Sequence, residues 1–118
     1  MLALLHEERG ADEIEAALDG AVMSCVNLSE VLQKAEQHGV DTEGLEFDLQ
    51  GLGVRLHDFD VRSARGAADL WPITRHRGLS LGDRVCLALT RVTGGTAITT
   101  DTRWAELETT GITVQVVR

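Results

Sequence analysis

The sequence is poor in lysine, cysteine, proline and aromatic residues, and these shortages exclude several classes of protein. Lys34 is the only lysine among eleven basic residues, and nineteen acidic residues bring the formal net charge to −8. Such a chain lacks the large basic surface of a general nucleic-acid-binding protein. Cys25 and Cys86 are too few for a disulfide framework or a zinc site, so we expect reduced thiols in the core.

Long apolar runs are also missing. No segment approaches the roughly 20 residues that a membrane helix requires, and no basic leader precedes the apolar start. We therefore expect a cytoplasmic protein without a membrane partner. A length of 118 residues predicts one domain over residues 1–118. The basic residues are nearly all arginines, whose forked guanidinium suits phosphate or carboxylate.

Segments with helical and strand patterns alternate along the chain. Helices are predicted over residues 1–8, 12–18, 27–38, 42–52, 61–70, 81–93 and 102–107, and strands over 21–25, 54–57, 96–100 and 112–117. Asp60 is the expected cap of its helix, and Trp71-Pro72 is expected to end that helix. The alternation predicts an α/β fold, a mainly parallel central sheet with helices on both faces.

The stretch from Leu79 to Asp101 carries the first functional indication. Ser80 is a good N-cap, and Asp83 follows at the third helical position, where an acid suits the positive end of the helix. Gly94-Gly95 is expected to end this helix, and Asp101 follows the strand after it. Ligands of open α/β sheets gather at the carboxyl ends of the strands, where these acids are expected.

Three acids, Glu30, Asp83 and Asp101, are each predicted to open a helix. Helix capping alone explains any one of them, because an acid in the first turn contributes about 0.3–1 kcal/mol. At one edge of a parallel sheet, however, three carboxylates repel one another unless a cation lies between them. Sites made of oxygen ligands select Mg²⁺ or Mn²⁺, which activate water and stabilise in-line phosphoryl displacement.

Four segments together resemble PIN-domain ribonuclease toxins of the VapC type, and the resemblance covers essentially the whole chain. They are residues 2–8, 27–31, 78–89 and 97–105. The resemblance implies an α/β PIN-like sandwich and an enzyme that cleaves RNA with Mg²⁺ or Mn²⁺. It also implies a toxin–antitoxin pair, with a cognate antitoxin as partner. The catalytic and metal-binding acids of the family match Glu30, Asp83 and Asp101.

Two further side chains are predicted to support this site. Thr100 lies where the family often has a hydroxyl beside its last acid, and it either holds a metal-bound water or simply forms part of the strand. Arg84 is expected to pair with its neighbour Asp83. A homodimer is expected, and the apolar first helices are either core or dimer face.

The loop before Ser80 is the predicted RNA contact. Arg75 and Arg77 either meet an RNA phosphate there or lie in a solvated loop. Trp71 and Trp104 are expected to be core or partner-facing anchors rather than platforms for base stacking.

The start of the chain departs from the family pattern. These proteins normally begin with a central strand ending in Asp-x-Ser, whereas this sequence begins inside the helix that follows it. We expect that strand and its metal-binding acid in frame upstream of Met1, so that residues 1–118 are N-terminally incomplete. The alternative function is a truncated, catalytically weak decoy that binds an antitoxin or a full-length subunit. A phospho-acceptor receiver domain is disfavoured, because it needs a lysine after a late strand and Lys34 is the only lysine.

Overall fold

A computed structural model describes residues 4–5, 20–99, 103–104 and 112–116. The strands are β1 (Leu4–Leu5), β2 (Val22–Ser24), β3 (Arg55–His57), β4 (Thr96–Thr99) and β5 (Thr113–Val116). The helices are α2 (Cys25–Gln37), α3 (Leu45–Gly51), α4 (Val61–Asp69), α5 (Trp71–Thr74) and α6 (Leu81–Thr93), with a 3₁₀ turn, η1, over Arg75–Arg77. The helix predicted over 12–18, most of the one over 102–107, and the site residues Thr100 and Asp101 lie outside the described residues.

The five strands form one sheet in the order β3-β2-β1-β4-β5. β2 pairs in parallel with β3, and β4 pairs in parallel with β5, whereas β1 runs antiparallel to both β2 and β4. Four strands therefore run in the same direction, and their carboxyl ends meet at one edge. This arrangement confirms the predicted α/β class with short parallel strands.

The prediction for the start of the chain is wrong at Leu4 and Leu5, which form strand β1 and not a helix. Leu5 pairs with Val22 on one side and with Ala97 on the other. β2 and β4 are thus not direct neighbours, because β1 lies between them. The physical reason is tertiary. A helical preference of a few tenths of a kcal/mol per residue is smaller than the roughly 1–3 kcal/mol for each buried backbone group left unpaired on β2 and β4.

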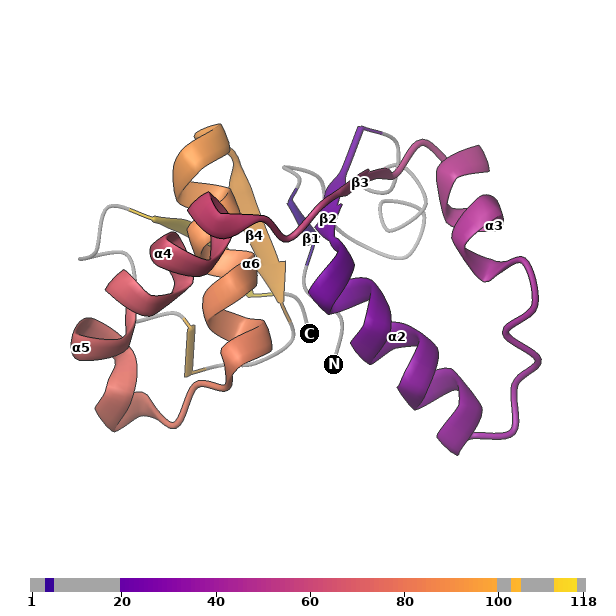
Figure 1. Cartoon of the computed structure of the whole chain (residues 1–118), viewed down its shortest axis with the longest axis horizontal. Coiled ribbons are helices and arrows are strands. Elements are labelled where there is room, and N and C mark those ends of the chain that lie inside the picture. Colours follow the sequence, from indigo (N-terminus) through magenta and orange to yellow (C-terminus); the bar gives the residue numbers. More distant parts are fainter. Residues whose placement is uncertain (1–3, 6–19, 100–102, 105–111, 117–118) are drawn as a thin grey trace.

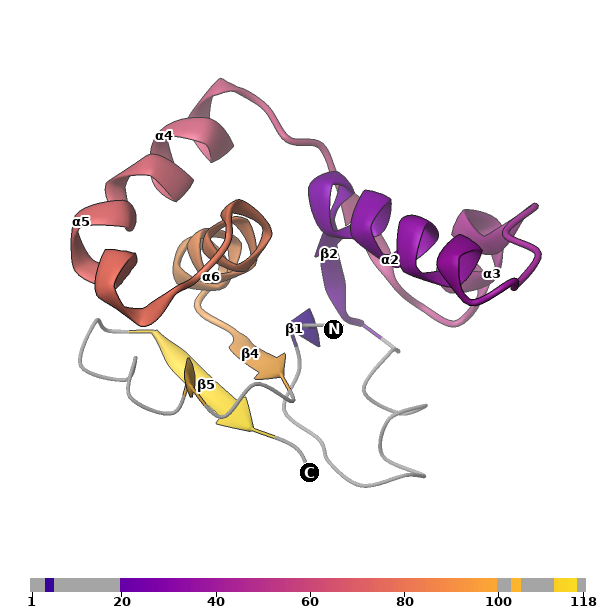
Figure 2. The same cartoon turned by 90° about the horizontal axis from the view of Figure 1, so that it is seen from below.

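The core has two parts, one on each side of β1. The larger cluster includes Leu70, Leu87 and Trp104, all fully buried, and joins α4 and α6 to β4 and β5. A smaller cluster around Met23 and Leu49 joins α2 and α3 to β2 and β3. Figures 1 and 2 show these two groups of elements side by side, with α4, α5 and α6 on one side of β4 and β5. Helices on the opposite face of the sheet remain a prediction.

Several helix ends match their predicted capping residues. The Asp60 carboxylate accepts from the Ser63 amide at 2.9 Å and begins α4. Gly94 ends α6 with a φ of +73°, a conformation that side-chain-bearing residues rarely adopt. Trp71-Pro72 follows the end of α4, as predicted, but it also begins a second short helix, α5. Pro72 lies in the first turn of α5, where its missing N–H costs nothing.

Candidate active site

Glu30 lies in the second turn of α2, as its sixth residue, and not at the helix start that the sequence predicted. The helix begins earlier than expected because Ser24 is its N-cap and accepts from the Val26 amide at 3.2 Å. Asn27, the predicted cap, is instead a buried residue inside the helix. Capping therefore does not explain Glu30.

Asn27 connects the Glu30 carboxylate to α6. Its side-chain Nδ2 donates to Glu30 Oε1 at 3.0 Å and to the Gly82 carbonyl oxygen at 3.0 Å. A buried amide with two such acceptors holds the glutamate in one orientation against a helix 52 residues further along the chain. Sequence reasoning missed this role. A polar residue between two apolar ones, Val26 and Leu28, could have indicated it, but Asn27 was interpreted as a helix cap.

Gly82 permits the close approach of Glu30 to α6. A Cβ atom at this position would collide with both carboxylate oxygens of Glu30. Gly82 is buried and is the second residue of α6, so the Glu30 carboxylate lies against the first turn of that helix. The positive end of the helix dipole is a favourable place for this charge.

Asp83 closes the first turn of α6 as predicted. The Ser80 hydroxyl accepts from the Asp83 amide at 3.2 Å, and Asp83 Oδ2 accepts from the Ser80 amide at 3.0 Å. This capping box confirms the structural role of Asp83. The second oxygen, Oδ1, has no hydrogen-bond partner among the described residues, so a ligand role is compatible with the capping role.

The Cys86 thiol is affected by the charges of both Glu30 and Asp83. Burial raises the pKa of its thiol to about 12, and the negative charges of Asp83 and Glu30 add to the rise. Both carboxylates therefore act on the same point, one turn into α6. Cys86 stays protonated at neutral pH and is not a candidate nucleophile or ligand.

Arg84 does not pair with Asp83, so the predicted ion pair is wrong. Its Nη1 donates to the Ala67 carbonyl oxygen of α4 at 3.3 Å, and its buried Nε has no partner among the described residues. The reason is helical geometry, since successive residues of a helix point in different directions. Arg84 thus connects α6 to α4.

The loop before α6 contains the predicted RNA-contact residues. Arg75 and Arg77 are the ends of η1, and the guanidinium of Arg75 lies over the Trp71 ring with Cζ 5.5 Å from its centroid. Trp71 is half exposed, whereas Trp104 is fully buried and confirms the expectation of a core residue. The contact with RNA remains a prediction.

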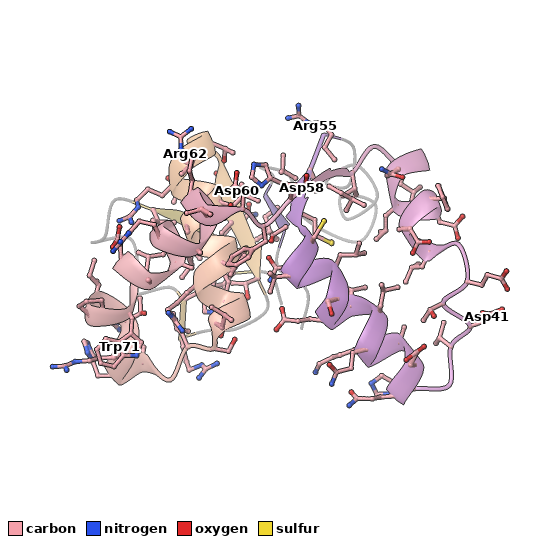
Figure 3. All side chains as sticks on the ribbon, in the orientation of Figure 1. Asp41, Arg55, Asp58, Asp60, Arg62 and Trp71 are labelled. Carbon is pink, nitrogen blue, oxygen red and sulfur yellow. The ribbon has the colours of Figure 1, made fainter. Side chains whose placement is uncertain are left out.

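A cavity of about 330 Å³ lies elsewhere, between the start of α4 and the later turns of α6. Its polar lining includes His57, Asp60 and Arg62, and neither Glu30 nor Asp83 borders it. Asp60 and Arg62 lie on the side of α4 away from Trp71 (Figure 3). The acid site is therefore distinct from this cavity.

The chemistry of the donor set suits a hard divalent cation. Glu30 and Asp83 present carboxylate oxygens, which Mg²⁺ and Mn²⁺ prefer. Within the described ranges no cluster of three or more potential metal-ligating side chains occurs. The third predicted acid, Asp101, follows β4, whose carboxyl end lies at the same edge of the sheet, but Asp101 itself lies outside those ranges.

The site combines an α/β fold with two carboxylates, those of Glu30 and Asp83, at the first turn of α6. Comparison with known protein families identifies the family of this chain. The PIN domain family model matches residues 1–109, so the chain belongs to the PIN domain family, whose members are generally metal-dependent nucleases. A search of curated proteins finds no match. None of the helices described here is both long and apolar enough to cross a membrane.

Proposed function

We propose that this PIN domain is an endoribonuclease dependent on Mg²⁺ or Mn²⁺ and the toxin of a toxin–antitoxin pair. One observation carries the catalytic part of the proposal. The Glu30 carboxylate is held by Asn27 against Gly82, next to Asp83, although no capping role requires a glutamate there. The toxin role and the antitoxin partner rest on the resemblance to VapC-type proteins. The homodimer and the cytoplasmic location are carried over as expectations from the sequence.

In this proposal Glu30, Asp83 and Asp101 hold the cation through carboxylate oxygens. A cation held by these residues would activate a water and would offset charge on the leaving oxygen of the RNA phosphodiester. Asn27 fixes the orientation of Glu30, and Ser80 does the same for Asp83 through the capping box. Thr100 is the proposed supporting hydroxyl beside Asp101.

The test is RNA cleavage as a function of Mn²⁺ concentration for Glu30→Gln, Asp83→Asn and Asp101→Asn. Each variant should lose most cleavage and keep or raise its melting temperature, because removing one of several crowded charges relieves repulsion in the metal-free fold. Asp83→Asn is the exception in stability: it keeps an acceptor oxygen for the Ser80 amide but loses the interaction of the charge with the helix dipole, so it should be destabilised by at most about 1 kcal/mol. Parent-like cleavage by all three variants would show that these acids do not form the catalytic site.

Glu36→Gln is the matched control for Glu30→Gln. Glu36 is exposed in the last turns of the same helix, and no described contact connects it to α6. The same change of charge and shape should leave cleavage at the parent rate. Equal losses in the two variants would indicate a general effect of charge and not a metal site.

The decoy alternative is favoured by one observation, the composition of the central strand. β1 consists of two leucines and brings no acid to the sheet, whereas the resemblance implies a catalytic acid on the central strand. If the decoy alternative holds, we expect tight binding of a cognate antitoxin and no metal-dependent cleavage of RNA. Cleavage that depends on Glu30 and Asp83 would contradict it.

A further inference from the structure

An exposed tryptophan and an arginine form a stacked pair at the end of the molecule that holds the start of α6. Trp71, the first residue of α5, is 50% exposed, and the Arg75 guanidinium lies over its ring. Figure 3 shows Trp71 at the outer end of α5. The residues beneath the pair belong to the core: Leu70 and Thr74 are buried, and Thr74 Oγ1 donates to the Leu70 carbonyl oxygen at 2.8 Å.

Positive charge gathers beside this pair in a chain that is acidic overall. Arg75, His76 and Arg77 follow one another in η1, and the first two are exposed. The turn after them has a defined shape, since Gly78 adopts a φ of +69°. Arg103 Nη1 donates to the Gly78 carbonyl oxygen at 3.1 Å, which fixes the turn from a distant part of the chain.

The basic turn leads directly into the acid site. Arg75 lies eight positions before Asp83, so the two Cα atoms are at most about 29 Å apart. Figures 1 and 2 show the segment after α5 running to the first turn of α6, where Gly82 contacts Glu30. A single strand of RNA bound at the carboxylates is therefore within a few nucleotides of the stacked pair.

We propose that Trp71 and Arg75, against the expectation from the sequence, form a stacking platform for an unpaired base of single-stranded RNA, a few nucleotides from the scissile phosphate. An aromatic ring beside basic side chains is the combination that binds single strands, because every base has a stacking face and every nucleotide has a phosphate. The choice of RNA as ligand rests on the proposed nuclease function. The basic side chains favour RNA over an apolar protein partner.

The experiment measures binding of a short, labelled, single-stranded RNA of mixed sequence in EDTA, where the proposed metal-dependent cleavage is blocked. Trp71→Ala should weaken binding about five- to 150-fold, the loss of one stacked base. Trp71→Phe should retain most of the affinity. Arg75→Ala should reduce the slope of log affinity against log salt concentration by the equivalent of about one phosphate contact. Arg75→Lys keeps the charge and should keep this slope, but it should still lose affinity because lysine cannot stack as a planar guanidinium does.

Tryptophan fluorescence gives an independent measurement. Bases that stack on Trp71 should quench its emission, whereas the fully buried Trp104 should not respond. RNA should therefore quench the parent but not Trp71→Phe, in which Trp104 is the only tryptophan. Double-stranded RNA should quench neither, since its bases are already stacked.

Phe47→Ala and Arg55→Ala are the matched controls. Both residues are exposed, and they lie away from α5, Phe47 in α3 and Arg55 in β3. Both variants should bind RNA as the parent does. Parent-like affinity in Trp71→Ala, equal binding of duplex RNA, or a loss only of binding to a protein partner would overturn the platform. A parent that binds no RNA would overturn both proposals. Stacking without any metal-dependent cleavage would overturn the nuclease proposal alone.

Discussion

At the scale of single residues, the proposed metal site depends on the missing side chain of Gly82. Gly82→Ala places a methyl group where the Glu30 carboxylate lies. The obstructing atoms are the flexible end of a side chain, so Glu30 is expected to swing away while the fold remains. We expect cleavage to fall to the level of Glu30→Gln, with little loss in melting temperature. Cleavage and thermal unfolding of the same preparation check this.

Gly66→Ala is the control for this glycine substitution. Gly66 also lies inside a helix, and a Cβ there would meet the Ala88 Cβ at 3.5 Å, an ordinary contact. Alanine should stabilise α4 by about 0.5–1 kcal/mol and leave cleavage unchanged. If Gly82→Ala behaved in the same way, with full activity, Glu30 would not be needed in its observed position.

At the scale of one element, the start of α4 depends on the charge of Asp60. Hydrogen bonds from the Ser63 amide and hydroxyl lower the pKa of this carboxyl below its ordinary value, and the nearby His57 lowers it further. A depressed pKa means that the ionised form stabilises the folded state. This stabilisation is present above the pKa of the unfolded state and is lost as the pH falls through the folded value.

Asp60→Ala should therefore melt at a lower temperature than the parent at neutral pH. The difference should shrink as the pH falls from about 4 through the lowered pKa of the folded state, because the parent carboxyl then becomes protonated. Thermal melts across this pH range are the measurement. Asp58→Ala, which removes an exposed acid two residues away that caps no helix, should show no such convergence. A gap for Asp60→Ala that stays constant down to pH 2 would contradict the charged-cap explanation.

At the scale of the whole molecule, metal binding should stabilise the fold, because the proposed ligands come from separate elements on both sides of β1 (Figure 1). A ligand that binds only the folded state adds about 2.7 kcal/mol at a concentration 100 times its dissociation constant. Mn²⁺ should raise the melting temperature of the parent but not of Glu30→Gln. Glu36→Gln should respond as the parent does. An equal rise in all three proteins would mean that Mn²⁺ acts on the net charge of −8 and not at a site.

Elements whose signals are local could be predicted from the sequence. Asp60 and Ser80 were identified as caps because each bonds to an amide three residues away. The strands around Met23, Leu56, Ala97 and Val114 were found within a residue or two of their ends. Glu30 and Asp83 were selected as candidates from the sequence, and their role in a metal site stays a prediction.

The sequence by itself determined the α/β class, the caps and the candidate acids, because these depend on hydrogen bonds and apolar periodicity within a few residues. The tertiary structure decided the strand at Leu4–Leu5, the buried amide of Asn27 between Glu30 and Gly82, and the partner of Arg84. In each of these cases the deciding contact joins residues at least 17 positions apart. A buried polar group must find a partner wherever the fold provides one, and this requirement outweighs local preference.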